Sequence, residues 1–374
     1  MLHGLAFFPW MTVKSRTEVG PLTLLPYRRG ELPGDLPAVT QAQMDAVLSA
    51  YAERPHHRIG TGTIVELNDW RSGWDPTPVV ERLFDAREAL AFSALANRRL
   101  FCGHFGYCSF DNFALVVQRY SAERPGRFAY TTRRRDGGTQ NLWSASEFTF
   151  NRPLHVNKSI GWDWDDSLVA TLQCTERETW RDAVFEFNRA NTDSPDVPVH
   201  VEIIMVKSAF ERLFGVDQSV VKFENALLSH LGEPAPERCV EASLAEKWRI
   251  ARPNAARPIA AWAREFCARR GAAAHGIKRA ERHFVWTEQA HLAFSAILFP
   301  LLFRKIAADA GEYVLSPRDA ERLRRVDEYV TCDPFSTKYG QINGAQHPWN
   351  RIDDACRAAD LAVRVGGRKG RRRY

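Results

Sequence analysis

A change of residue pattern near positions 150–165 divides the chain into two parts of different kinds. Before it, short runs of β-branched and aromatic residues are separated by turns rich in Gly and Pro, which is typical of strands. After it, apolar residues recur every three or four positions between capping residues, which is typical of helices. The sequence therefore predicts an α+β protein: a β-rich mixed domain over 1–155, an all-α helical bundle over 156–331, and a loop with a basic C-terminal tail over 332–374.

In the first part, the pattern predicts strands over 61–67, 113–120 and 127–134, and a helix over 79–96. Asp136-Gly137-Gly138 is typical of a hairpin turn, and a further extended segment over 141–150 follows it. These segments predict a meander in the second half of the domain.

In the second part, apolar periodicity and capping residues indicate six helices, at about 168–189, 199–214, 217–231, 258–270, 287–310 and 316–330. Gly215 is placed to end the second of these helices in a left-handed conformation. Pro300 implies a kink or a split in the fifth, because proline removes a helical hydrogen bond.

The net charge of +6 is concentrated at the C-terminus. The last eleven residues contain six cations and no acid, so 45 cations accompany 45 acids in the rest of the chain. Such a tail adds salt-sensitive affinity for a polyanion such as RNA or DNA, but it does not determine the fold.

Features of membrane and secreted proteins are weak in this sequence. The longest apolar stretch, 292–303, is shorter than the roughly 20 residues that cross a bilayer, and it is typical of a core helix. Residues 1–10 lack a basic start, and seven scattered cysteines do not form a disulfide framework. We therefore expect a cytoplasmic protein with no membrane partner.

The helix expected from Pro258 carries an arginine in an unusual position. Its apolar stripe contains Trp262 and Phe266, and Arg270 lies four residues further along the same stripe. Arg269 is rotated by about 100° toward the polar face. An unpaired buried charge is costly, so Arg270 is expected to bind an anion or another partner.

His275 follows Arg270 by five positions. Positions five apart are about 140° apart around an ideal helix, so they do not share one face. They can converge only if the helix ends or bends, which Gly271 and Gly276 would permit.

Arg270-x4-His275 followed by Gly276 resembles the Rx4–6H motif of HEPN domains, the helical ribonuclease domains found in bacterial toxins and antiviral effectors. The surroundings are also similar, since 205–214 resembles an early core helix and 286–303 the helix after the motif. The resemblance covers roughly residues 165–331 and is strongest to Apea-like HEPN proteins. The chain departs from the family at Gly271, where a polar residue is common.

This resemblance implies a metal-independent endoribonuclease that needs no cofactor, leaves 2′,3′-cyclic phosphate ends and acts as a homodimer on single-stranded RNA or tRNA loops. It also implies a role as a toxin or antiphage effector, in which the N-terminal domain senses a trigger or restrains the nuclease. His275 would move a proton at the ribose 2′-OH or the leaving 5′-oxygen, since imidazole titrates near neutral pH. Arg270 would bind the scissile phosphate in two hydrogen bonds. The cations expected to follow the RNA backbone are Arg269, Lys278, Arg279 and Arg282.

Other interpretations of the same residues stay open. Arg270 could cap the end of its helix beside an incidental His275. A non-catalytic HEPN-like module that binds RNA or protein, such as an antitoxin or adaptor, agrees with Gly271 and with the electroneutral body. A metal-dependent nuclease would use Asp163, Asp165 and Asp166, which are otherwise residues that cap a helix. The sequence contains no Walker loop, dinucleotide fingerprint or nucleophile elbow, which argues against ATP-driven, nicotinamide-dependent and serine-hydrolase functions.

Overall fold

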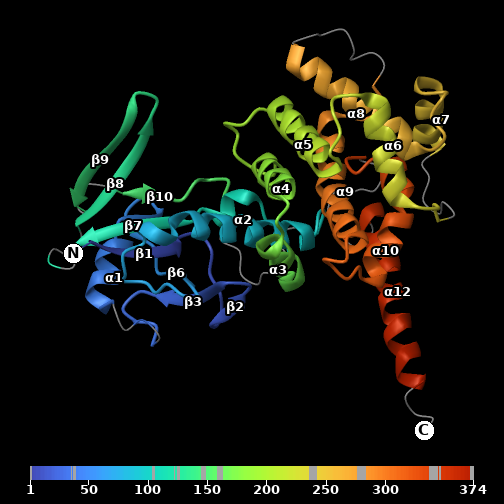
Figure 1. Ribbon diagram of the computed structural model, residues 1–374. Coiled ribbons are helices and arrows are strands. Elements are labelled where there is room, and N and C mark those ends of the chain that lie inside the picture. Colours follow the sequence, from blue (N-terminus) through green and yellow to red (C-terminus); the bar gives the residue numbers. More distant parts are fainter. Residues whose placement is uncertain are drawn as a thin grey trace. The chain divides into compact units, whose positions relative to one another are not determined.

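The computed structural model describes residues 2–34, 36, 39–102, 106–121, 123, 127–144, 149–157, 163–235, 242–275, 284–336, 344 and 347–370. They form two compact units: Met1–Leu95 with Cys108–Gln173, and Ala96–Tyr107 with Cys174–Tyr374 (Figure 1). The first unit contains the sheets and the second is helical, which confirms the predicted α+β class. The units are not divided at residue 155, because a short segment after residue 95 belongs to the helical unit and the chain rejoins that unit only at Cys174.

The first unit contains a seven-stranded antiparallel sheet in the order β2-β3-β6-β1-β7-β8-β9. Its strands are β1 (Leu2–Phe8), β2 (Thr17–Val19), β3 (Leu22–Arg28), β6 (Thr61–Leu67), β7 (Val116–Ser121), β8 (Arg127–Arg134) and β9 (Gly137–Ser144). A three-stranded sheet contains β10 (Phe150–Asn151), β4 (Tyr51–Arg54) and β5 (His57–Arg58). The helices of this unit are α1 (Gln41–Leu48), α2 (Val80–Asn97) and α3 (Asp166–Cys174), of which α2 continues into residues assigned to the helical unit.

The strands predicted over 61–67 and 127–134 and the helix predicted over 79–96 are confirmed. The predicted hairpin is confirmed, but its turn is Arg135-Asp136 rather than Asp136–Gly138, because Arg134 pairs with Gly137. Gly137 has a φ of 126°, a backbone conformation that glycine adopts readily, and it already begins β9.

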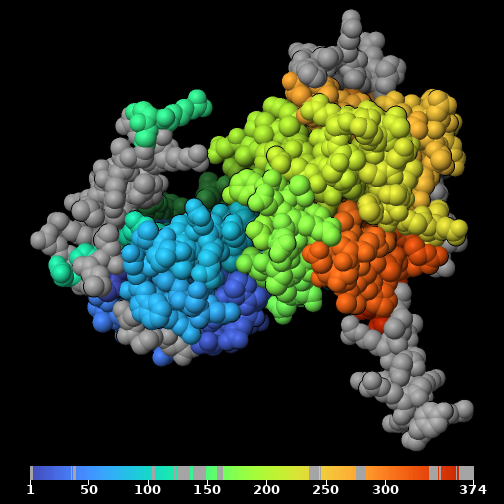
Figure 2. Space-filling view, viewed as in Figure 1, coloured from blue at the N-terminus to red at the C-terminus, as the bar shows by residue number. Residues whose placement is uncertain are grey.

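The second unit is a bundle of α4 (Glu178–Ala190), α5 (Val199–Phe214), α6 (Val220–Leu231), α7 (Ala242–Ala251), α8 (Pro258–His275), α9 (Glu288–Asp309), α10 (Pro317–Arg324), α11 (Val326–Thr331) and α12 (Pro348–Gly370). Its core is aromatic: the Phe210 ring of α5 lies 5.2 Å from Phe299 of α9, and Phe299 stacks on Phe187 of α4 at 4.4 Å. Offset and edge-to-face ring pairs of this kind add to the stabilisation from apolar burial. In the space-filling view, α4, α5 and α6 form a continuous surface of this unit (Figure 2).

Several helix boundaries differ from those expected. The helix expected over 168–189 is interrupted between α3 and α4, where the Thr175 hydroxyl accepts the Arg177 N–H and the Thr175 carbonyl accepts from the Arg181 side chain. Side-chain bonds of this kind compete with helical ones. The expected end of α5 is confirmed, since Gly215 adopts a φ of 65°. The helix containing Pro300 is not split, because α9 passes through that residue without interruption.

The expectation of loop and tail over 332–374 is wrong, because α12 occupies much of this segment. Its Trp349, Ile352 and Cys356 recur at helical spacing and are buried. These three side chains attach α12 to the bundle, where it packs on α10 and α11.

Among the described residues, α9 alone is long and apolar enough to cross a membrane. However, 72% of its most apolar window is buried inside the unit, as in the core helix of a bundle.

Candidate functional site

The apolar stripe of α8 is buried as predicted, but Arg270 does not continue it into the core. Ile259, Trp262 and Phe266 are at most 1% exposed. Arg270 is half-buried, and its Nη1 donates to Gln218 Oε1 at 3.3 Å in a solvent-exposed hydrogen bond. Gln218 lies in the connection between α5 and α6, at the surface of the unit. The expectation of a charge buried at this position is therefore wrong.

Arg269 is the more enclosed of the two arginines. Its Nη2 donates to the Trp286 carbonyl at 2.9 Å, and its guanidinium carbon lies 3.6 Å from the centre of the Phe284 ring. Only 14% of its side chain is exposed. The expectation that Arg269 faces the polar side is also wrong, because residues 284–286 pack over this side of α8. Arg269 is thus engaged in the fold by backbone and aromatic contacts.

The helix continues through the motif. Gly271 lies within α8, in open space, and His275 is the last residue of this helix that the structure describes. The helix does not end between positions 270 and 275, and on a regular helix these positions are about 140° apart. Lys278, Arg279 and Arg282 lie outside the described residues, as does the side chain of His275.

A buried polar cluster holds the segment that follows the motif against α8. The Glu265 carboxylate accepts the backbone N–H groups of Val285 at 2.8 Å and of Trp286 at 2.9 Å. It also lies 3.2 Å from Nε2 of His291, and neither side chain is exposed. Buried polar groups are tolerated when they are hydrogen-bonded in this way. Glu265 is not among the residues predicted from the sequence, although a glutamate three residues after Trp262 on an apolar helix is a usable signal.

His291 is held in its neutral form. Burial lowers its pKa from 6.5, and the hydrogen bond with Glu265 opposes this shift. The hydrogen-bond network assigns the Nε2–H as the donor to Glu265. His291 is therefore a core residue that fixes the start of α9.

The titration of His291 predicts how stability depends on pH. The unfolded chain binds a proton below about pH 6.5, whereas the folded state resists this protonation, so stability is complete above that pH and falls below it. Between pH 7.5 and 5.5 the contribution of His291 to the unfolding free energy is at most about 1.4 kcal/mol, the value reached if the folded state takes up no proton. We expect the unfolding free energy of His291→Gln to fall less than that of wild type between pH 7.5 and 5.5, because glutamine forms hydrogen bonds but does not titrate. Urea unfolding at the two pH values measures both losses. Equal losses in both proteins would contradict this role.

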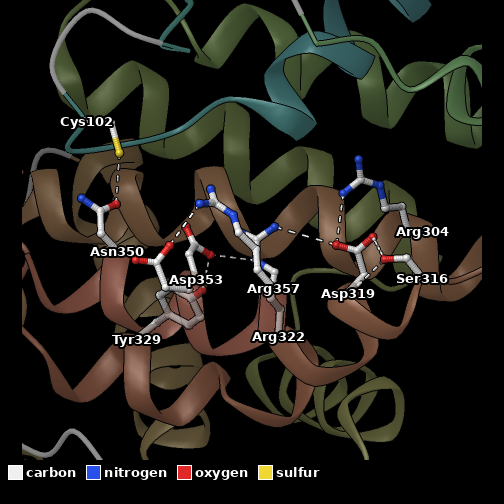
Figure 3. Close-up of polar contacts among 10 residues, drawn as sticks. Cys102, Arg304, Ser316, Asp319, Arg322, Tyr329, Asn350, Asp353 and Arg357 are labelled. Carbon is white, nitrogen blue, oxygen red and sulfur yellow. Dashed lines mark hydrogen bonds and ion pairs between the residues drawn. The ribbon is translucent and has the colours of Figure 1, made fainter. Parts of the chain in front are cut away.

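A second buried network joins α9, α10, α11 and α12 (Figure 3). Asp319 accepts from Arg304 at 3.4 Å and lies 3.8 Å from Arg322, while Arg322 Nε lies 3.2 Å from Asp353. Tyr329 donates its hydroxyl to Asp353 at 2.7 Å. All five residues are at most 9% exposed.

The charges in this second network support one another. Burial would lower the pKa of Arg322, but the carboxylates of Asp353 and Asp319 oppose it, and the pKa is raised. Burial, followed by Asp353, raises the pKa of Tyr329, which keeps its hydroxyl as a donor. These groups are turned inward, so the network is a structural one that fixes α12.

In the part of the chain that the structure describes, no group of three or more His, Cys, Asp or Glu side chains is placed to hold a metal ion. Asp165 accepts the Leu168 N–H at 3.0 Å at the start of α3. This contact is the helix-capping role that the sequence analysis weighed against a metal role for the aspartates near this position.

Comparison with known proteins identifies no relative, since no family model, curated protein or solved structure matches the chain.

Proposed function

We propose that the chain is a metal-independent endoribonuclease of the HEPN type, in which Arg270 and His275 are the working pair. The main support is the contrast between the two arginines of one helical turn. Arg269 is enclosed by Phe284 and Trp286, whereas Arg270 hydrogen-bonds a neutral side chain at the surface. A phosphate can replace such a contact with two charge-assisted hydrogen bonds. Arg270 is therefore the arginine that would bind the scissile phosphate.

In this proposal the two residues of one active site come from two chains. Positions 270 and 275 are about 140° apart on a regular helix, which favours a site in which each chain supplies one of the two residues. In a homodimer, Arg270 of one copy meets His275 of the other. The intervening positions are occupied by Gly271 and three alanines, which are half-buried or exposed. Their small side chains allow another backbone to approach closely.

The reaction that follows from this arrangement uses the RNA as its own nucleophile. His275 removes the proton of the ribose 2′-OH, whose oxygen attacks the adjacent phosphorus, and the P–O5′ bond breaks. The departing 5′-oxygen takes up a proton, and the upstream fragment retains a 2′,3′-cyclic phosphate. Arg270 stabilises the negative charge that increases on the phosphate oxygens in the transition state.

A mixing experiment tests the shared site. Arg270→Ala and His275→Ala chains are each expected to be inactive on single-stranded RNA in EDTA. After equal amounts of the two are unfolded and refolded together, half of the dimers should be mixed, and each mixed dimer should contain one site with both residues. Cleavage should therefore return to about a quarter of the wild-type level. A mixture that stays inactive, although mixed dimers are demonstrated by differently tagged chains, would contradict the shared site.

A non-catalytic module that binds RNA or protein is the second candidate function. The angular separation of positions 270 and 275 on one unbroken helix favours it if the chain is a monomer. Such a module would bind its partner equally well as wild type and as His275→Ala, and neither protein would cleave RNA.

A further inference from the structure

The helical unit contains a pocket of about 350 Å³ that is remote in sequence from the motif on α8. It is lined by the end of α4 and the connection that follows it, by α5 and α9, and by separate residues between 98 and 107 together with Phe335. This volume lies within the range of small-molecule sites, and eight of its fourteen lining residues are apolar. Phe101 and Phe335 supply aromatic rings that pack edge to face with their centres 5.6 Å apart, and Ala293 and Ala296 of α9 are small residues of the lining.

The polar groups of the pocket are held in place by neighbours. The Arg98 side chain donates to Asn191 Oδ1, and the Asn191 amide donates to the Phe187 carbonyl at 2.7 Å. Asp193 accepts the Tyr107 hydroxyl at 2.7 Å. A site whose polar groups are already oriented loses less entropy when a ligand binds.

The charges of the pocket limit the ligands that it can take. One guanidinium, Arg98, lies with two carboxylates, Asp193 and the buried Glu202. The formal charge of the lining is therefore negative, which disfavours a polyphosphate or a fatty acid. Carboxylates accept hydrogen bonds, whereas a guanidinium only donates them. A fitting ligand presents N–H donors and a carbonyl oxygen on a flat apolar body that can lie against Phe101 or Phe335.

We propose that this pocket binds a guanine base. The ring N–H and the exocyclic amine of guanine are adjacent donors for the carboxylate of Asp193 or Glu202. The guanine O6 atom is an acceptor for Arg98. Proteins that take up an unstacked base use this combination of edge hydrogen bonds and contact with aromatic faces. The base comes either from a free nucleoside or from an unpaired guanosine in RNA. The inference goes beyond the proposed nuclease and does not depend on it.

Calorimetric titration of the full chain with nucleosides tests the chemistry. Guanosine is expected to bind about tenfold more tightly than inosine, which lacks the exocyclic amine, and more tightly still than adenosine. Glu202→Gln and Asp193→Asn should together weaken guanosine binding by about tenfold or more.

Ala296→Trp fills the pocket and should abolish binding. Ala308→Trp is the matched control, because Ala308 lies on the same helix at similar exposure and does not line the pocket.

The source of the base is decided by titrating a 2′-O-methyl oligouridine with and without one central guanosine, since 2′-O-methyl groups prevent cleavage. Preference for the guanosine-containing strand that Ala296→Trp removes identifies RNA as a source. Binding of guanosine alone, with no such preference, identifies the free nucleoside. The proposal is overturned if neither ligand binds, if adenosine binds as tightly as guanosine, or if Ala296→Trp, folded as judged by circular dichroism, binds with unchanged affinity. None of these results depends on whether the chain cleaves RNA.

Discussion

Replacing His275 with alanine is expected to lower RNA cleavage by about 10²–10⁴-fold, because a positioned acid–base group contributes a factor of this size. The measurement uses purified full-length chain with tRNA and a mixed-sequence single-stranded RNA in EDTA, and it follows the appearance of 2′,3′-cyclic phosphate ends. Arg270→Ala should have a comparable effect through lost charge stabilisation at the phosphate.

The structure provides matched controls for this experiment. His200 is an exposed histidine on α5 and Arg249 an exposed arginine on α7, so alanine at either position tests for loss of a surface charge or ring. Both controls should retain wild-type cleavage. Cleavage that His275→Ala leaves unchanged would refute the assigned role. If the wild-type chain cleaves no RNA and its expression does not harm cells, the non-catalytic binding module is favoured over the nuclease.

The elements that could be predicted from the sequence are those with local signals. Helix α5 was expected from Val199 to Phe214 because its apolar residues recur at helical spacing and Gly215 follows, and both bounds are correct. Strand β1 was not expected. Its Leu2–Phe8 is an almost continuous apolar run in the interior of the sheet, and such a run lacks the alternation that distinguishes a strand from a short buried helix.

The candidate site was predicted only in part, because helical periodicity identifies the apolar face of a helix but not the residue at which this face leaves the core. Extrapolating the stripe of α8 one turn beyond Phe266 placed Arg270 inside and Arg269 outside. The folded chain reverses this order, since residues 284–286 return over Arg269 and Arg270 meets a surface connection. This packing joins residues 17 positions apart, and no local pattern encodes it.

The same limit applies to the buried networks. Glu265 is stabilised by backbone N–H groups about 20 residues away, and Asp353 by side chains from α10 and α11. A charged residue on an apolar stripe signals that a partner exists, but only the fold identifies the partner. At Glu265 and Asp353 the partners are internal, so these residues hold the bundle together. At Arg270 the partner is a neutral surface amide, which leaves the guanidinium with capacity for an anion.

Replacing Asp353 with alanine is expected to lower the unfolding free energy of the helical unit by about 3–5 kcal/mol, because it leaves Arg322 buried without its nearer carboxylate. Tyr329→Phe removes only one hydrogen bond and should cost about 1–3 kcal/mol. Asp354→Ala is the matched control: it lies one position along α12, is exposed and pairs with Arg357 at 3.0 Å, so it should cost at most about 1 kcal/mol. Urea unfolding followed by helical circular dichroism measures all three. Comparable losses for Asp353→Ala and Asp354→Ala would show that the network does not hold α12. The expected difference would instead show that the C-terminal helix is part of the cooperative bundle, since its attachment depends on charges buried between α10, α11 and α12.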